Sequence, residues 1–213
     1  HASIYNILVI KNDTKYRTDS LVVVSVNDKR HSAFSMKSAM MNIDYDGTLT
    51  LVNLGKSITN HIDRYFNITD NKEVAKADTA EQSFKMLISI RPHPLINEVL
   101  FPTLTRFSGA ELQGDFSNRK QQLNMVLNVP SLRLGSNSVD NMHAEVHSDN
   151  SALTYALTFD GVKSSKLKIA QTRLAGNLQK NTLAFELDIN DNEARQKKKD
   201  KDKTHKLYIT GNL

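Results

Sequence analysis

A period of two in the apolar residues of segment 122–129 is the feature that most limits what this chain can fold into. Asn124 and Asn128 fall on one side of an extended chain, together with Gln122. The apolar residues fall on the other side, with Val126 as the exception: Leu123, Met125, Leu127 and Val129. Such alternation is typical of a β-strand that has one apolar and one solvated face.

The same alternation recurs about every ten residues from Gly109 almost to the last residue. Polar turn signals separate the repeats, among them Asp160-Gly161 and Gln179-Lys180-Asn181. Short connections between strands of period two mean that neighbouring strands are antiparallel. About eight or nine strands are expected in this half of the chain. The N-terminal half adds segments rich in strand-forming residues: 3–10, 20–26, 33–38, 41–48 and 84–90.

Two stretches depart from this period and predict short amphipathic helices. The first runs from about Leu51 to Phe66, where apolar residues recur every three or four positions. The second covers about 94–107; Pro94 suits its first turn, and Pro102 is expected to bend or interrupt it. Two roles are open for these helices. They either pad the sheet or sit in a trough as plugs.

Most predicted strands have only one apolar face, and two short helices cannot cover all of them. The apolar face must therefore fold over on itself, as a closed barrel or a curled trough. The fold class that we expect is mainly β, a long curled antiparallel meander forming a U-shaped groove, with two short helices. Residues 1–78 would form an N-terminal part ending in a polar loop, and 79–213 the remaining meander, within one continuous sheet.

A weaker repeat supports curvature of the sheet. Four segments share the pattern apolar-x-Gly-polar-apolar, and their glycines are Gly47, Gly114, Gly176 and Gly211. Each glycine falls on the inward side of its predicted strand. There the missing side chain permits a close approach, a bulge or a bend.

Composition and charge exclude several functional classes. The chain has no cysteine, which removes disulfides, thiolate metal sites and cysteine nucleophiles. The formal net charge is +5, but the segment 195–203 holds six basic and two acidic residues and so contributes +4. Nucleic-acid binding needs basic residues spread over folded elements, so it is not expected here. We expect this lysine-rich segment to be a hairpin loop, or alternatively a contact for anionic lipid headgroups.

No catalytic or cofactor motif is present, so neither an enzyme nor a cofactor is expected. His143, Glu145 and His147 alternate along a strand and would point to its solvated face, where a metal site is not expected. Asp44 and Asp46 are expected to be exposed for the same reason. The chain has no apolar run of 18 residues, so the sequence predicts no transmembrane helix. We expect the chain to be a fragment of a longer protein.

The order of segments resembles a known family. The phrases that carry the likeness, in chain order, are Asp44-Tyr45-Asp46-Gly47-Thr48-Leu49, Asp63-Arg64-Tyr65-Phe66, Phe84-Lys85-Met86-Leu87-Ile88, the second helix and Leu112-Gln113-Gly114-Asp115-Phe116. This arrangement is similar to the TamB-like proteins of the AsmA-like superfamily, in the form found in Bacteroides relatives. The lysine-rich segment and the two helices depart from the uninterrupted sheet of that family.

The resemblance implies a part of a protein that is anchored in the inner membrane and spans the periplasm. It implies an apolar β-groove that carries phospholipid acyl chains to the outer membrane or supports outer-membrane protein assembly. An outer-membrane β-barrel of the Omp85 type would be a partner. The alternative is an all-β structural or adhesin-like module that binds protein and has a closed core.

The inward positions of the C-terminal meander define the candidate groove lining. Their side chains are apolar, apart from the hydroxyl of one tyrosine, and none is charged. The candidates are Leu123, Met125, Leu127, Val129, Met142, Val146, Leu153, Tyr155, Leu157, Phe159, Leu167, Ile169, Leu183, Phe185 and Leu187. If the core is instead closed, the same residues pack on one another and hold no ligand.

Overall fold

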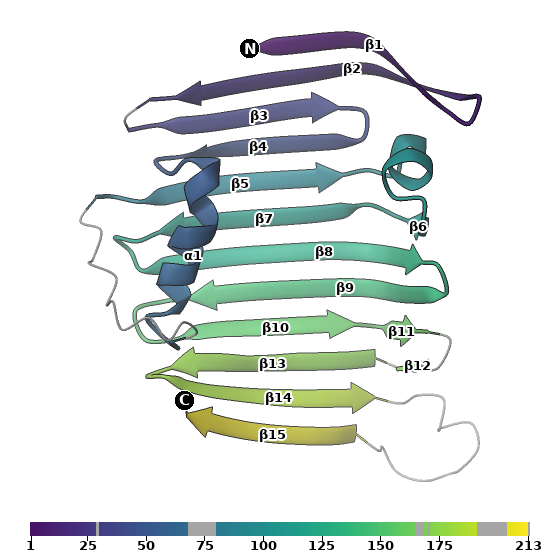
Figure 1. Cartoon of the computed structure of the whole chain (residues 1–213). Coiled ribbons are helices and arrows are strands. Elements are labelled where there is room, and N and C mark those ends of the chain that lie inside the picture. The colour runs from purple at the N-terminus through teal and green to yellow at the C-terminus, as the bar shows by residue number, and fades with distance from the viewer. Residues whose placement is uncertain (29, 68–79, 165–167, 170, 191–203, 213) are drawn as a thin grey trace.

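The computed structural model describes residues 1–28, 30–67, 80–164, 168–169 and 171–190, together with the backbone of 204–212. All strands of this part belong to one antiparallel sheet (Figure 1). Twelve of them follow one another across the sheet in the order β1-β2-β3-β4-β5-β7-β8-β9-β10-β13-β14-β15. Three short strands lie off this path: β6 pairs with β8, β11 pairs with β9 and β12, and β12 pairs with β11.

Strands occupy most of the segments in which the sequence pattern predicts them. Their bounds are β1 (Ala2–Lys11), β2 (Thr14–Asn27), β3 (Ser32–Ser38), β4 (Met41–Gly47), η1 (Leu51–Asn53), α1 (Leu54–Ile62), β5 (Ser83–Ile90), η2 (Leu95–Leu100), β6 (Leu104–Phe107), β7 (Ala110–Ser117), β8 (Gln122–Leu134), β9 (Asn137–Ser148), β10 (Leu153–Phe159), β11 (Gly161–Lys163), β12 (Lys168–Ile169), β13 (Gln171–Gln179), β14 (Thr182–Asn190) and β15 (Thr204–Asn212).

The sheet is open. Its path begins at β1 and ends at β15, and these two strands do not pair with each other. The predicted class is thus confirmed: the protein is mainly β, a long antiparallel meander with two short helices. The closed core that the alternative interpretation assumed is not found in the described part of the chain.

The first helix is placed correctly by the sequence but is shorter than predicted. A 3₁₀ turn, Leu51–Asn53, leads into the α-helix Leu54–Ile62. Tyr65 and Phe66 follow in a turn, in which their backbone N–H groups donate to the carbonyl of Ile62. Helix ends often tighten in this way, and the apolar period alone does not locate them.

The second helix differs more from its prediction than the first helix does. The predicted span of about 94–107 contains only one π-helical segment, Leu95–Leu100, and its last four residues form strand β6 against β8. Pro102 cannot donate a backbone hydrogen bond, so the helix cannot continue through it. Leu104, predicted to lie on the helix, instead pairs with Leu134 and is buried.

Some predictions fall outside the described residues. They concern most of the polar loop that follows α1 (residues 68–79), the lysine-rich segment 195–203, and Leu167. None of the helices in the described part of the chain has the length and hydropathy needed to span a bilayer.

Helix α1 lies across one face of the sheet, from β4 towards the turn between β13 and β14 (Figure 1). At its far end the backbone N–H of Asn181 donates to the carbonyl of Tyr65 (2.8 Å), and the Asn181 side chain accepts from the N–H of Asn67 (2.9 Å). The helix therefore bridges strands that are more than a hundred residues apart in the chain.

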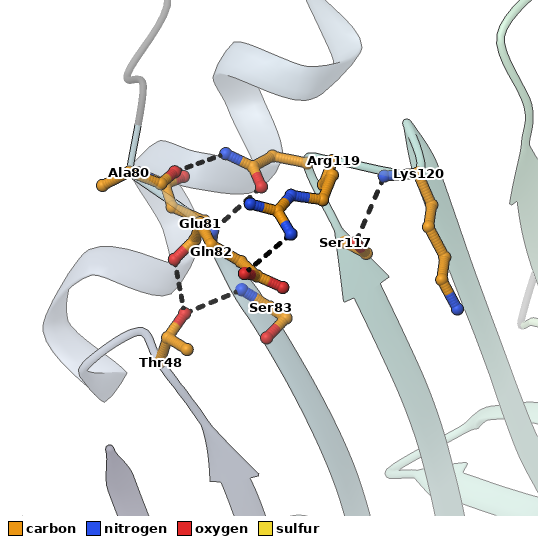
Figure 2. Close-up of polar contacts among 9 residues, drawn as sticks. Thr48, Ala80, Glu81, Gln82, Ser83, Ser117, Arg119 and Lys120 are labelled. Carbon is orange, nitrogen blue, oxygen red and sulfur yellow. Dashed lines mark hydrogen bonds and ion pairs between the residues drawn. The ribbon is translucent and has the colours of Figure 1, made fainter. Parts of the chain in front are cut away.

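A polar network fixes the point at which the chain returns to the sheet and enters β5 (Figure 2). Thr48 Oγ1 donates to the carbonyl of Glu81 (3.0 Å) and accepts from the N–H of Ser83 (2.9 Å). The Glu81 carboxylate lies 3.4 Å from the Arg119 guanidinium, an exposed ion pair of small energetic value. These contacts tie the ends of β4 and β5 to the turn between β7 and β8.

The inward glycines make room for large neighbours, as predicted. Gly114 faces the side chains of Phe84 and Met86, and Gly176 lies beneath the ring of Tyr155. A Cβ on Gly176 would collide with the carbonyl oxygen of Ala184 and lie 2.6 Å from Tyr155 Oη. Because a backbone atom stands in the way, the strand itself would have to shift.

We therefore expect Gly176→Ala to lower the free energy of unfolding by about 1–3 kcal/mol. Gly55, in α1, is the matched control, because a Cβ there meets nothing within 4 Å. Gly55→Ala should raise stability by about 0.5–1 kcal/mol, since alanine favours the helix. Urea unfolding followed by circular dichroism compares the two. Equal effects of the two substitutions would contradict this packing.

Candidate functional site

The face of the sheet beneath α1, which we call the apolar face, is organised in rows that run across the strands. In an antiparallel sheet, residues directly opposite each other point to the same face and their side chains touch. The register of the sheet extends three such rows over nine strands, from β3 to β14. None of the three rows contains a charged residue.

The first row lies at the strand ends that α1 crosses. A hydrogen bond from the N–H of Leu123 to Ser148 Oγ continues this row from β8 to β9. The row runs through the residues Ser32, Gly47, Phe84, Phe116, Leu123, Ser148, Leu153, Leu178 and Leu183. Phe84 and Leu123 are 2% and 1% exposed. The first row therefore forms much of the core, to which Tyr45 and Leu49 also belong.

The second row is partly covered. It runs through Phe34, Tyr45, Met86, Gly114, Met125, Val146, Tyr155, Gly176 and Phe185. Ile58 of α1 belongs with Met86 and Met125 to the shell of one core cluster, and Ile62 with Tyr155 to that of another. Burial raises the pKa of Tyr45 to about 12, so its hydroxyl is neutral and donates to the carbonyl of Leu49 (2.6 Å).

The third row lies beyond α1 and belongs to neither core cluster. It runs through Met36, Ile43, Ile88, Leu112, Leu127, Ala144, Leu157, Leu174 and Leu187. All nine are half-buried, because neighbouring strands flank them on both sides. Helix α1 and η2 lie at opposite ends of the strands (Figure 1). The third row is thus an apolar strip that α1 leaves uncovered.

A buried histidine holds α1 against the sheet. His61 is 2% exposed, and its Nε2 lies 2.8 Å from Ser148 Oγ, which also accepts from the backbone N–H of Leu123 (2.9 Å). The imidazole contacts the rings of Phe116 and Tyr65 edge-on, at 5.2 and 5.4 Å between centroids. Its other nitrogen, Nδ1, has no hydrogen-bond partner among the residues that the structure describes.

Burial, with a smaller contribution from the Arg64 charge, lowers the pKa of His61 to about 4. An unfolded histidine titrates near 6.5, so the unfolded chain binds more protons between these two values. Stability contributed by the neutral imidazole is therefore complete above pH 6.5 and is lost as the pH falls towards 4. We expect a loss of about 3 kcal/mol over this interval.

The measurement is urea unfolding at a series of pH values, for the wild type and for His61→Phe. Phenylalanine keeps the ring packing but does not titrate, so the stability of the variant should change less between pH 6.5 and 4. His31 works in the opposite direction, since its hydrogen bond with Asp46 raises the His31 pKa. His31 is present in both proteins and cancels in the difference. Parallel pH profiles would contradict a neutral buried His61.

The structure brings most of the predicted groove residues onto the apolar face. Leu123, Leu153 and Leu183 belong to the first row, and Met125, Val146, Tyr155 and Phe185 to the second. Leu127, Leu157 and Leu187 are in the third. Beyond it, Val129 pairs with Met142 at the next inward position, and Phe159 pairs with Thr172.

Ile169 is the predicted lining residue that lies apart. It belongs to β12, which pairs only with the short strand β11 and not with the main path of the sheet. Leu167 is outside the described residues.

The prediction also missed half of the face. It began at Leu123, yet the rows extend through β3, β4, β5 and β7. The period of two in these strands was visible, but the sequence did not show that they join the same rows. The register supplies that information.

The opposite, polar face carries the residues weighed for metal binding. His143 Nδ1 lies 2.6 Å from Asn128 Oδ1, and His147 Nδ1 contacts Asn124 Oδ1, so both pair with side chains of the neighbouring strand. Glu145 lies on the same face and lines an open hollow of about 550 Å³ together with His147. Asp44 and Asp46 are exposed, as predicted.

Comparison with known proteins adds no identity. No family model, no curated protein and no solved structure matches this chain.

Proposed function

We propose that the apolar face binds the acyl chains of lipids. The observation that carries this proposal is the third row: a continuous uncharged strip, nine strands wide, that α1 leaves uncovered. At about 4.8 Å per strand, eight steps from β3 to β14 make it roughly 38 Å long. That length exceeds the reach of one extended acyl chain across a single leaflet, since a whole hydrocarbon core is about 30 Å thick.

The physical chemistry of the strip suits such a ligand. Exposing an acyl chain to water costs about 0.8 kcal/mol per CH₂ group. A row of Leu, Ile and Met side chains removes this cost without directional bonds, so a bound chain can shift along the row with little resistance. The row has no ionised group at which a sliding chain would stall.

Helix α1 acts as padding in this proposal, which favours one of the two roles considered for the helices. Its buried contacts through His61 and Tyr65 hold it over the first row. The Tyr65 hydroxyl donates to the carbonyl of Asp149 (2.5 Å) at the far strand ends. The helix thereby seals one margin of the sheet and leaves the third row open to a ligand.

The resemblance to TamB-like proteins supports the cellular setting that we propose for this activity. We propose that the chain is part of a periplasmic, membrane-anchored protein that moves phospholipid between the inner and outer membranes, or that supports outer-membrane protein assembly. An outer-membrane β-barrel of the Omp85 type is the partner that this setting implies. No enzymatic step and no cofactor enter the proposal.

The direct test is a binding titration of the purified chain with a fluorescent fatty acid, followed by competition with unlabelled phospholipid. The proposal predicts saturable binding that phospholipid displaces. It also predicts protection of the third row, such that a fluorophore coupled to a cysteine at Leu174 moves to an apolar environment when lipid is added. Absence of saturable binding would refute it.

A further inference from the structure

A row of basic residues crosses the sheet at the strand ends opposite α1. Arg106 of β6 pairs with Arg133 of β8, which pairs with Ser138 of β9. Ser138 pairs with Lys163 of β11, which pairs with Lys168 of β12. Directly opposite residues share a face, so four basic side chains from four strands form one line. We call it the basic row.

The alternate positions of the same strands form an apolar row. It consists of Phe107, Leu132, Val139, Val162 and Ile169. Side chains alternate between the two faces of a strand, so the apolar row and the basic row point in opposite directions. The apolar row accounts for the pairing of these short strands. The basic row is the separate surface that this pairing presents, and its two arginines and two lysines are exposed.

Arg106 lies directly opposite Arg133 in the sheet, and Lys163 lies directly opposite Lys168. Like charges directly opposite each other destabilise a sheet. Within the described part of the chain, neither Arg106 nor Arg133 forms an ion pair, and the same holds for Lys163. Asp140, the nearby acid of β9, accepts a hydrogen bond from Ser131 (3.2 Å). An anionic surface laid along the row would turn this repulsion into attraction.

Exposed apolar side chains lie at the same corner. Leu100 and Phe101 are 57% and 59% exposed at the end of η2, and the chain that follows them lies beside the end of β8. The N–H of Gly135 donates to the carbonyl of Thr103 (2.8 Å) and so joins the two segments. Figure 1 shows β6, β11 and β12 together at this end of the strands.

We propose that this corner, the basic row with Leu100 and Phe101, docks on the surface of a bilayer that contains anionic phospholipid. Basic side chains beside exposed aliphatic and aromatic ones suit the headgroup layer, where cations meet phosphates and apolar tips enter the acyl boundary. At about 4.8 Å per strand the basic row spans roughly 19 Å, enough to meet several headgroups. A single-stranded nucleic acid would need aromatic rings along the row on which bases stack, and the row contains none.

The experiment is co-sedimentation of the purified chain with vesicles of phosphatidylcholine, or of phosphatidylcholine mixed with phosphatidylglycerol in equal amounts. We expect binding to the mixed vesicles at low salt and its loss at high salt. The double variant Arg106→Gln/Arg133→Gln should bind them about thirty-fold more weakly, since each basic residue near the surface contributes roughly fivefold. Phe101→Ser should also weaken binding.

Arg17→Gln/Arg173→Gln is the matched control, because it removes two exposed arginines elsewhere and changes the net charge equally. Retained binding in this control supports the proposal. Equal loss in both double variants, no preference for mixed vesicles, or tighter binding of a single-stranded oligonucleotide than of mixed vesicles would overturn it. The fluorescent fatty acid titration, run on the same variants, measures acyl-chain binding by the apolar face independently of vesicle binding. Loss of docking with intact acyl-chain binding, or the reverse, distinguishes the two proposals.

Discussion

Replacing Phe84 by alanine is expected to lower the free energy of unfolding by about 3–5 kcal/mol. The side chain is 2% exposed in the first row. Its ring stacks on the ring of Tyr45 with 6.1 Å between the two centroids, and its centroid lies 5.6 Å from that of the Phe116 ring. Removing it leaves a cavity beneath α1 that these neighbours cannot fill, because Gly47 and Gly114 beside it have no side chain to contribute.

Leu87→Ala is the matched control for Phe84→Ala. Leu87 lies in the same strand, on the polar face, and is 40% exposed. Its truncation should cost less than about 1 kcal/mol, since little apolar surface leaves the protein interior. Urea unfolding followed by circular dichroism measures both. Similar losses would mean that the two faces of β5 are packed alike, against the architecture described here.

The largest functional effect is expected from a charge in the third row. Leu127→Asp should weaken binding of a fluorescent fatty acid at least tenfold, because a carboxylate held against an acyl chain loses its water without gaining a partner. Leu127 is half-buried and pairs with Leu112 and Ala144, so the charge would stand in the middle of the strip. The substitution should leave the first row and α1 intact.

Val126→Asp tests the same charge at the neighbouring position on the polar face. Position 126 pairs with Gln113 and Glu145 on that face. The substitution should therefore leave acyl-chain binding unchanged. Circular dichroism of both variants checks that the sheet is retained. If the two variants bind equally well, or if both lose binding to the same degree, the third row is not the site.

The strands were predictable because each carries its own signal. The alternation in 122–129 depends only on residues that are neighbours in the chain, and the pleat turns that alternation into two faces. The inward glycines were predictable for the same reason. The first helix was also visible in its period, although its end at Ile62 depended on a turn that the pattern does not show.

The prediction of the second helix was wrong over its second half, because the apolar spacing and the proline at position 102 favour different structures. Leu104 and Phe107 continue the helical spacing, yet Pro102 removes a donor between them and the first half. The pairing of Leu104 with Leu134 then stabilises a strand. This long-range contact decides the outcome, and sequence spacing alone does not contain it.

The candidate site was predictable in kind and less so in extent. Inward residues of β8, β9, β10 and β14 could be found strand by strand, but the rows exist only once the register is fixed. The basic row shows most clearly what cannot be predicted from the sequence alone. Its members come from four separate segments, whereas the sequence draws attention to the compact lysine run at 195–203.

Photocrosslinking in intact cells that express the protein tests the central claim most directly. A photoreactive residue would replace Leu127 or Phe185 on the apolar face, and Val126 or Glu186 on the polar face in the matched controls. If lipid acyl chains travel along this sheet, phospholipid is captured from Leu127 and Phe185 and not from the controls. Equal capture from both faces, or capture from neither, would contradict that account.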